Sequence, residues 1–207
     1  MGFYSRYIFP HILECCSSGS DTEEQRRLLL ASAKGEVLEI GFGTGRNFPH
    51  YPSGLARVIA IDCERMQSRR VQQRIKAASV PITPIYQDAS SRLPFQDDSF
   101  DTVVTTWTLC SIDNLGSALQ EISRVLKPEG CYLFLEHGRS NDPKVAKKQS
   151  LLAPVVRVVG AGCHMNREID RLISEAGLQI VALDRFTMPN TPRILGEMYR
   201  GVAHVAR

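Results

Sequence analysis

The stretch V-L-E-I-G-F-G-T-G-R-N, residues Val37–Asn47, decides the fold. Its first residues, together with Glu36, form a short apolar run of strand length, and glycines follow at once. Glycine lets a backbone turn tightly and lets a ligand approach without a Cβ in the way. The stretch therefore predicts a buried strand at 36–40, a ligand-binding loop and a helix that opens after the loop.

The spacing of the glycines separates two kinds of cofactor loop. A dinucleotide fingerprint places its third small residue three positions after the second glycine, and that position is Arg46 here. The chain has G-x-G-x-G instead, at Gly41, Gly43 and Gly45. Glu39 suits a ligand with an ammonium group, such as the methionine portion of S-adenosylmethionine (SAM), and would repel a pyrophosphate. The loop thus favours SAM over NAD.

Acidic side chains follow the next two predicted strands. Asp62 comes directly after the strand at 57–61, where a carboxylate can accept hydrogen bonds from both hydroxyls of a ribose. Asp88 follows the strand at 81–86, and its carboxylate and the adjacent backbone N–H suit the edge of an adenine. Alone, each marker is also found in tight turns and helix caps. Their order along the chain favours a nucleoside-containing cofactor.

Beyond the loop, apolar runs of strand length alternate with helical patterns. This alternation predicts a doubly wound, Rossmann-like α/β sheet of about seven strands, mostly parallel, with an antiparallel C-terminal strand. The proline and the glycine in Lys127–Gly130 are expected to end a helix there, before the next strand. Further strands are expected at 57–61, 81–86, 101–106, 131–136, 180–186 and 197–206, and helices at 3–16, 64–78, 114–126 and 167–176. Residues 17–22 are expected to form a flexible joint.

Length and composition are those of an ordinary globular protein. The chain has 207 residues, of which 43% are hydrophobic and 23% charged, so we expect one domain spanning residues 1–207. The net charge of +3 is small and the arginines are scattered, which argues against a nucleic-acid partner. No apolar run approaches the ~20 residues of a membrane span. We expect a soluble, cytoplasmic protein, with peripheral contact to a membrane left open.

The six cysteines show no C-x-x-C spacing and no regular framework. A domain of this size needs no disulfides, so free thiols in a reducing compartment are expected. The adjacent Cys15 and Cys16 have no second ligand pair nearby, and the sequence therefore predicts no metal site.

Three segments together resemble the class I SAM-dependent methyltransferases: E-V-L-E-I-G-F-G-T-G (36–45), L-P-F-Q-D-D-S-F-D (93–101) and R-V-L-K-P-E-G (124–130). The resemblance extends over about half the chain, from Glu36 to Gly138. It implies that SAM binds across the carboxyl ends of the strands, with the methionine portion at the glycine loop above Glu39, the ribose on Asp62 and the adenine at Asp88. The implied cofactor residues are Tyr4, Glu39, Gly41, Phe42, Gly43, Gly45, Asn47, Asp62, Cys63, Asp88, Ala89, Thr106 and Trp107.

Three further segments are T-L-C-S-I (108–112), F-L-E-H (134–137) and G-C-H-M-N-R (162–167). They are similar to the thiol methyltransferases of animals and to bacterial enzymes of the ubiquinone/menaquinone-methyltransferase type. This resemblance implies a small hydrophobic methyl acceptor. A thiol ranks first, then a quinone-type ring, then a phospholipid amine. The alternatives are a SAM-binding regulatory or partner module without catalysis and an NAD-dependent oxidoreductase.

Some acceptors require removal of a proton, and His137, His164 and Asp113 are the candidate bases. His137 has the best position, because it follows a strand, although a structural hydrogen bond explains it equally well. Direct transfer needs no covalent intermediate, so Cys110 and Cys163 are not expected to act as nucleophiles.

Two segments are expected to border the acceptor. For residues 1–20 the resemblance favours a helical lid, with Tyr4 or Tyr7 near the transferred methyl group. The alternatives are a helix that completes the core and a segment resting on lipid. Residues 139–166 form an acceptor-pocket insertion. Its apolar side chains between 144 and 160 suggest either a lipophilic pocket wall or core packing.

Overall fold

The computed structural model describes residues 14, 19–63 and 69–206. Tyr4, Tyr7, the pair Cys15–Cys16 and most of the predicted lid at 1–20 lie outside the described residues. The predictions for these residues are not tested by the structure.

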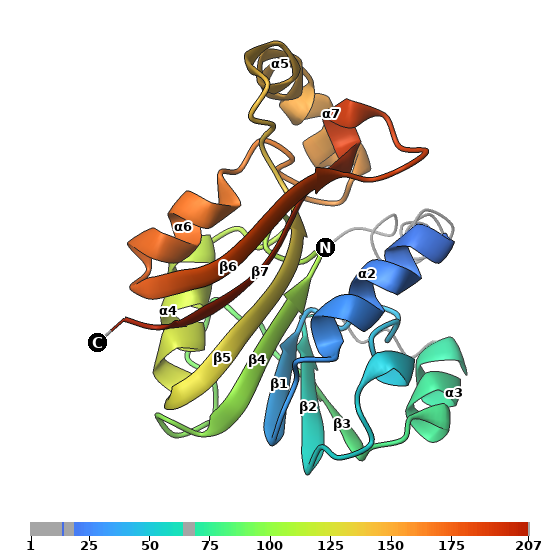
Figure 1. Cartoon of the computed structure of the whole chain (residues 1–207), viewed down its shortest axis with the longest axis vertical. Coiled ribbons are helices and arrows are strands. Elements are labelled where there is room, and N and C mark those ends of the chain that lie inside the picture. The colour runs from blue at the N-terminus through green and yellow to red at the C-terminus, as the bar shows by residue number, and fades with distance from the viewer. Residues whose placement is uncertain (1–13, 15–18, 64–68, 207) are drawn as a thin grey trace.

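The described strands form a single sheet of seven in the order β3-β2-β1-β4-β5-β7-β6 (Figure 1). Among them β7 alone runs in the direction opposite to the other six, which confirms the predicted mostly parallel, doubly wound sheet. The order reverses direction at β1, where β2 pairs on one side and β4 on the other. The strands are β1 (Glu36–Ile40), β2 (Arg57–Asp62), β3 (Ile82–Tyr86), β4 (Phe100–Thr106), β5 (Leu126–His137), β6 (Leu178–Thr187) and β7 (Glu197–Val205).

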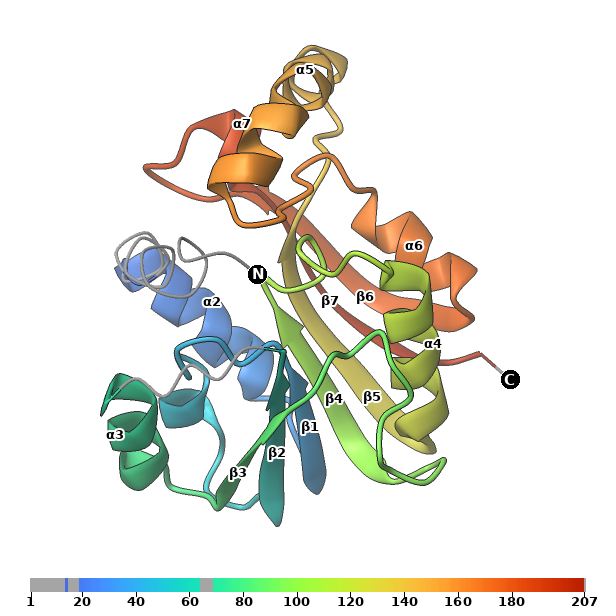
Figure 2. The ribbon, with the colours of Figure 1, turned by 180° about the vertical axis from the view of Figure 1, so that it is seen from behind.

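Helices cover both faces of the sheet (Figures 1 and 2). Neighbouring residues of a strand point to opposite faces, so the central strands supply two cores. Val37 of β1 packs in the first core and Leu38 in the second. The helices on the first face are α2 (Ser20–Leu30) and α3 (Arg69–Ala77), and those on the second are α4 (Leu115–Val125) and α6 (Ile169–Glu175). Because both faces of the central strands are covered, β1, β2 and β4 are largely buried, whereas the edge strand β6 is mostly exposed.

Helices α5 (Pro143–Val159) and α7 (Arg193–Gly196) lie beyond the carboxyl end of β5, away from the sheet (Figure 1). A buried amide fixes α5 to the body of the molecule. Oε1 of Gln149 accepts the backbone N–H of Ser140 at 2.8 Å, and Nε2 donates to the carbonyl oxygens of Gly138 at 2.9 Å and Ile194 at 3.2 Å. No helix within the described ranges has the length and apolar character needed to cross a membrane.

Two predictions about helices are wrong. The joint expected at 17–22 gives way at Ser20 to α2, which continues to Leu30 because Leu29 and Leu30 bury one face of it. The helix expected after the glycine loop is a run of turns and a single 3-10 turn, η2 (Phe48–His50). Buried Phe48 lies beneath the loop and Pro49 begins the turn, so the chain bends there and does not continue as a helix.

Helix α4 ends before Lys127–Gly130, as predicted, but the next strand begins earlier than the predicted residue 131. Strand β5 begins directly at Leu126, where α4 ends. Leu126 pairs with Phe100 and Cys131 pairs with Thr102, so the residues between them form an irregularity within the β4–β5 ladder. Because the residues before and after this segment both pair with β4, the segment stays in the sheet despite its proline and glycine.

Candidate active site

The glycine loop lies at the carboxyl end of β1, where the strand order reverses. In open α/β sheets this crevice is where ligands bind. Gly41, Gly43 and Gly45 have φ angles of 75°, 51° and 78°, a region that side chains rarely adopt. A Cβ on Gly41 would also lie 2.3 Å from the Thr108 side chain. The loop that approaches the crevice therefore depends on its glycines.

Asp62 lies against this loop at the end of β2. Its Oδ2 accepts the backbone N–H of Gly43 at 2.8 Å. Its carbonyl oxygen accepts the N–H of Gln87 at 2.9 Å, which joins the ends of β2 and β3. Farther along this edge, Asp88 is exposed and its Oδ1 accepts the N–H and hydroxyl of Ser90 at 2.9 and 2.8 Å. The predicted ribose and adenine positions thus follow one another along the edge, with buried Ala89 next to Asp88.

Glu39 supports the loop from beneath. Its carboxylate is buried and accepts hydrogen bonds from Asn47 Nδ2 at 2.9 Å and from the Tyr51 hydroxyl at 2.8 Å. Burial raises its pKa to about 7, although both hydrogen bonds act in the opposite direction. The structure gives Glu39 and Asn47 a role in holding the loop, and contact of Glu39 with the ammonium group of a ligand remains a prediction.

Arg26 of α2 is a site residue that the sequence analysis missed. Its Nη1 donates to Asn47 Oδ1 at 2.7 Å and to Thr106 Oγ1 at 2.9 Å. Its guanidinium carbon lies 4.5 Å from the centre of the Trp107 ring. Burial lowers its pKa to about 10, so the group stays charged at neutral pH. The sequence signal that could have identified it is its spacing: Arg26 lies three residues before the apolar Leu29, so the two share the buried face of the helix.

The residues present fit SAM. Nε of Arg26 is buried and has no hydrogen-bond partner among the described residues, and a carboxylate such as that of the methionine portion would supply one. Gly41, Gly43 and Gly45 would hold the methionine portion, and Asp62 would hold the ribose. Bound there, SAM supplies a methyl group already activated on a sulfonium.

The loop after β4 forms the next part of the edge. Trp107 has a φ angle of 50° and donates its N–H to the Leu135 carbonyl oxygen at 2.8 Å. The buried Glu136 accepts the N–H groups of Thr108 at 2.8 Å and Leu109 at 3.1 Å through one oxygen, Oε2. Burial, together with the nearby Cys110, raises its pKa to about 8. Glu136 therefore orients this loop.

His137 ends β5 next to two cysteines. Its Nε2 lies 3.1 Å from Sγ of Cys163, and Cys110 completes the group. The hydrogen bond from Cys163 holds the pKa of Cys110 well below its usual value. Burial alone would lower the pKa of His137, but the charge of Cys110 raises it. His137 could be predicted from the sequence, but this cluster could not, because its members are far apart in the chain.

The other candidate bases lie outside this cluster. His164 is half-buried and uses its backbone N–H to bind the Cys110 carbonyl oxygen at 2.8 Å. Asp113 is exposed and lies 3.6 Å from Arg157 in an ion pair. Neither residue lies at the end of a strand, as the half-buried His137 does.

Two predicted cofactor residues occupy contrasting positions. Phe42 is buried in the first core, with its ring centre 5.9 Å from that of Phe48 and 6.0 Å from that of Tyr86. Its side chain therefore supports the loop. Cys63 is exposed, directly after Asp62. Thr106 is buried beneath the edge, where it binds Arg26.

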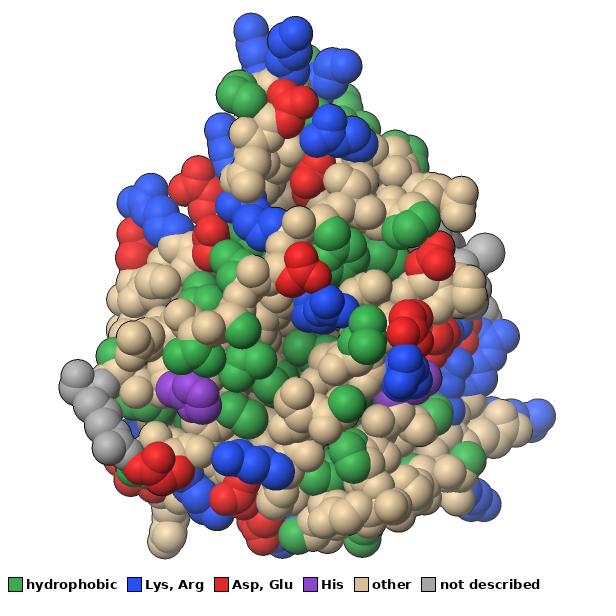
Figure 3. Space-filling view, viewed as in Figure 1, with side chains coloured by type: hydrophobic (Ala, Val, Ile, Leu, Met, Phe, Trp, Pro, Cys, Tyr) green, Lys and Arg blue, Asp and Glu red, His purple; other side chains and the backbone are tan. Residues whose placement is uncertain are grey.

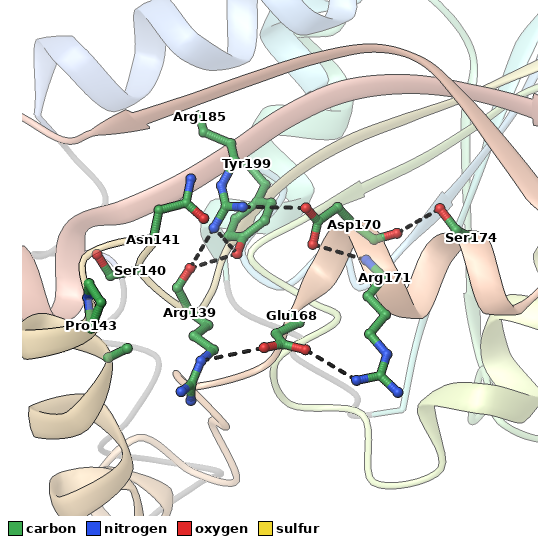
Figure 4. Close-up of a pocket in the computed structure, with 11 residues that line it drawn as sticks. Arg139, Ser140, Asn141, Pro143, Glu168, Asp170, Arg171, Ser174, Arg185 and Tyr199 are labelled. Carbon is green, nitrogen blue, oxygen red and sulfur yellow. Dashed lines mark hydrogen bonds and ion pairs between the residues drawn. The ribbon is translucent and has the colours of Figure 1, made fainter.

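A separate cavity of about 640 Å³ lies between the start of α5, helix α6 and strand β7 (Figure 4). Its charged groups are paired. Arg185 lies 3.3 Å from Asp170, and Arg139 lies 3.4 Å from Glu168. Arg185 also stacks on Tyr199, 4.1 Å from the ring centre. A lining this polar does not suit a hydrophobic acceptor, so we do not assign the acceptor to this cavity.

Ala146 of α5 is buried, but several larger apolar side chains of this helix do not pack in the core. Leu151 is 78% exposed, Val155 60% and Val158 75%. Of the two explanations that the sequence left open for this segment, core packing is therefore wrong for these residues. They are available to contact something outside the described fold.

Comparisons with known proteins show the family of this chain. Residues 38–134 match a family model described as a methyltransferase domain. Thiol S-methyltransferase TMT1B of Mus musculus is 30% identical over 91% of this chain and 84% of its own length. Phosphatidylethanolamine N-methyltransferase of Cereibacter sphaeroides is 27% identical over 80% of this chain and 82% of its own length. An S-adenosylmethionine-dependent methyltransferase structure from Clostridium acetobutylicum matches with a TM-score of 0.68 at 11% identity, covering 96% of this chain and 98% of that one.

Fold, site and relatives together define this chain as a class I SAM-dependent methyltransferase. Within that class it belongs to the family that includes thiol S-methyltransferase TMT1B.

Proposed function

We propose that this enzyme transfers the methyl group of SAM to the sulfur of a small, hydrophobic thiol. The observation that carries the proposal is the position of His137 at the carboxyl end of β5, 3.1 Å from Cys163. It lies beside the loop of Trp107, which borders the proposed cofactor site. A group that favours ionisation of the acceptor is thus placed where ligands of such sheets bind.

The chemistry of this edge suits sulfur. A thiol has a pKa of ~8.5, so a mild push toward the thiolate is enough for methyl transfer. His137 provides this push, either by accepting the proton or by holding a cation. A phenol or a ring carbon would want a stronger base. The neighbouring carboxylate, Glu136, is used to hold the loop after β4.

The relatives support the same order of acceptors. TMT1B is named as a thiol methyltransferase and matches most of this chain, whereas the Cereibacter enzyme is named for a phospholipid amine. A thiol therefore ranks above a phospholipid amine. A quinone-type ring stays in second place on the sequence resemblance, and a role for Tyr4 and Tyr7 as a lid stays a prediction.

We further propose peripheral contact with a membrane through α5. Its outward face carries Lys144, Lys147 and Lys148 in the first half and Leu151, Val155, Val158 and Val159 in the second. These positions recur every three or four residues, so they share one side of the helix. Figure 3 shows basic and hydrophobic side chains together at this end of the molecule. Such a face suits an anionic lipid surface, where hydrophobic thiols would concentrate.

An acceptor panel tests the proposed reaction. The protein with SAM is given an alkanethiol, a hydroquinone or phosphatidylethanolamine vesicles, and both products are measured by mass spectrometry. We expect methylation of the alkanethiol at a kcat/KM at least tenfold above the others. Preference for the hydroquinone or the amine would overturn the choice of sulfur. Tight SAM binding without turnover on any acceptor would favour the non-catalytic alternative.

A further inference from the structure

Three potential metal ligands converge from three separate parts of the chain. Cys110 belongs to the loop after β4, His137 ends β5, and Cys163 lies between α5 and α6. One ligand atom of each lies within 4.8 Å of the other two. Within the described ranges, no other group of His, Cys, Asp and Glu side chains was found this close in a metal-binding arrangement. Neither Cys110 nor Cys163 is in a disulfide, so both thiols are available to a metal.

The backbone around the cluster is fixed. The N–H of His164 donates to the carbonyl oxygen of Cys110 at 2.8 Å, which joins the two loops that carry the cysteines. Gly162, with a φ of 97°, turns the chain immediately before Cys163. Glu136 holds the Cys110 loop through the N–H groups of Thr108 and Leu109. Preformed ligand positions of this kind are what a metal site requires.

We propose that Cys110, His137 and Cys163 bind a zinc ion. Thiolate and imidazole are the ligands that zinc takes in proteins, and tetrahedral coordination places ligand atoms roughly 3.5–3.8 Å apart. The 3.1 Å contact and the 4.8 Å limit bracket this spacing. Two thiolates would also balance the charge of the ion, which matters because Cys110 is buried.

Three protein ligands leave one tetrahedral position open, which is the arrangement of a catalytic zinc. Cys163 and His137 are only partly buried, so the cluster can be reached from outside. Sγ of Cys110 lies 3.8 Å from the carbonyl oxygen of Trp107, at the wall of the cofactor site. Resting on the proposed function, we assign the open position to the thiol acceptor.

The reaction balances with this assignment. The acceptor thiol binds zinc as a thiolate and its proton passes to solvent. A lone pair of the acceptor sulfur forms the new bond to the methyl carbon. The bond from that carbon to the sulfonium breaks, and its electron pair stays on the donor sulfur. The thioether product carries no charge and is a weaker ligand, so it leaves.

Metal analysis of the full-length protein tests the site directly. After purification with zinc and dialysis, we expect about one zinc per chain by mass spectrometry. Cys110→Ser and Cys163→Ser should each reduce zinc affinity at least tenfold. Cys131→Ala is the matched control, because Cys131 is a buried free cysteine outside the cluster. Circular dichroism and SAM titration establish that each variant is folded.

Cobalt tests the open position without any methyl transfer. The Co²⁺-substituted protein should show thiolate-to-cobalt absorption, and adding an alkanethiol should change this absorption. The control is protein without Co²⁺, which should show no such absorption with or without the thiol. A folded wild type that takes up neither metal, or a disulfide between Cys110 and Cys163 in the purified protein, would overturn the site. Thiol methylation that survives zinc removal would overturn its role in the reaction while leaving the proposed function intact. Conversely, a cobalt response to thiol without methylation would count against the proposed function alone.

Discussion

The guanidinium carbon of Arg26 lies 4.5 Å from the centre of the Trp107 ring. Through this contact and two hydrogen bonds, helix α2 reaches the edge where β1 and β4 end. One buried cation therefore connects a helix of the first face with Asn47, Thr106 and Trp107.

Replacing Arg26 tests its proposed contact with the carboxylate of SAM. Arg26→Ala should weaken SAM binding roughly 10- to 100-fold, the effect of losing hydrogen bonds to a charged group. Calorimetric titration measures the affinity. Arg27→Ala is the matched control on the same helix, because the Arg27 side chain is 60% exposed and forms an ion pair with Glu24 on the helix surface. Equal losses in both variants would show that Arg26 acts through helix stability.

Asp62 is expected to bind the ribose as well as the glycine loop. Asp62→Ala should reduce affinity for SAM and for the demethylated product by about 100-fold, since both carry the same ribose. Calorimetry with SAM, the product and NAD gives the comparison, with the exposed Asp184→Ala as control. Unchanged binding in Asp62→Ala, or binding of NAD in place of SAM, would contradict the assignment of this edge.

Glu39 makes stability depend on pH. Its pKa is about 7 in the folded protein and near 4.5 when unfolded, so between these values the folded state holds more protons. The contribution of Glu39 is fully present below pH 4.5 and is lost as pH rises to about 7, a change of about 3 kcal/mol. Glu39→Gln removes this dependence.

Urea unfolding at pH 4.5 and pH 8 measures the effect. From pH 4.5 to pH 8, the free energy of unfolding of Glu39→Gln should rise relative to that of wild type by up to about 3 kcal/mol. Glu36→Gln, on the same strand but partly exposed, should shift little. A Glu39→Gln difference that does not change with pH would show that the carboxylate is ionised throughout.

Gly41 is expected to tolerate no side chain. Gly41→Ala places a Cβ at a φ of 75° and 2.3 Å from Thr108, so we expect a loss of about 2–4 kcal/mol and weaker SAM binding. Gly54→Ala is the matched control, because no atom lies within 4 Å of its added Cβ. Thermal unfolding distinguishes them. Equal melting temperatures for the two variants would mean that the loop adapts more than its backbone angles imply.

The outward face of α5 should bind anionic vesicles. Sedimentation with phosphatidylserine-containing vesicles should be lost in the double variant Val155→Glu and Val158→Glu, since both side chains are exposed and their burial in lipid drives binding. The control is Arg171→Glu, on α6 and away from this face. Binding that persists in the double variant would remove α5 as the contact. The fold should be unaffected, because neither valine packs in the core.

The sequence by itself determined the elements whose signals are local. The strand at Glu36–Ile40 and the helix at Leu115–Val125 were predicted at or near their observed bounds, because apolar periodicity and flanking glycines lie within a few residues of each other. The same holds for the glycine loop and for Asp62, whose places follow from their order after parallel strands. The sequence predicted a mostly parallel sheet with an antiparallel C-terminal strand, and the order of the strands came from the structure.

Only the tertiary structure decided the contacts that join distant segments. Arg26 reaches Trp107, and Cys110, His137 and Cys163 meet, because sheet pairing brings their loops to one edge. Nothing near each residue in the sequence encodes these distances. The start of α2 and the exposure of Val158 on α5 were likewise fixed by which surfaces found a partner. Local patterns specify what each segment can form, and long-range packing selects which side chains share a site.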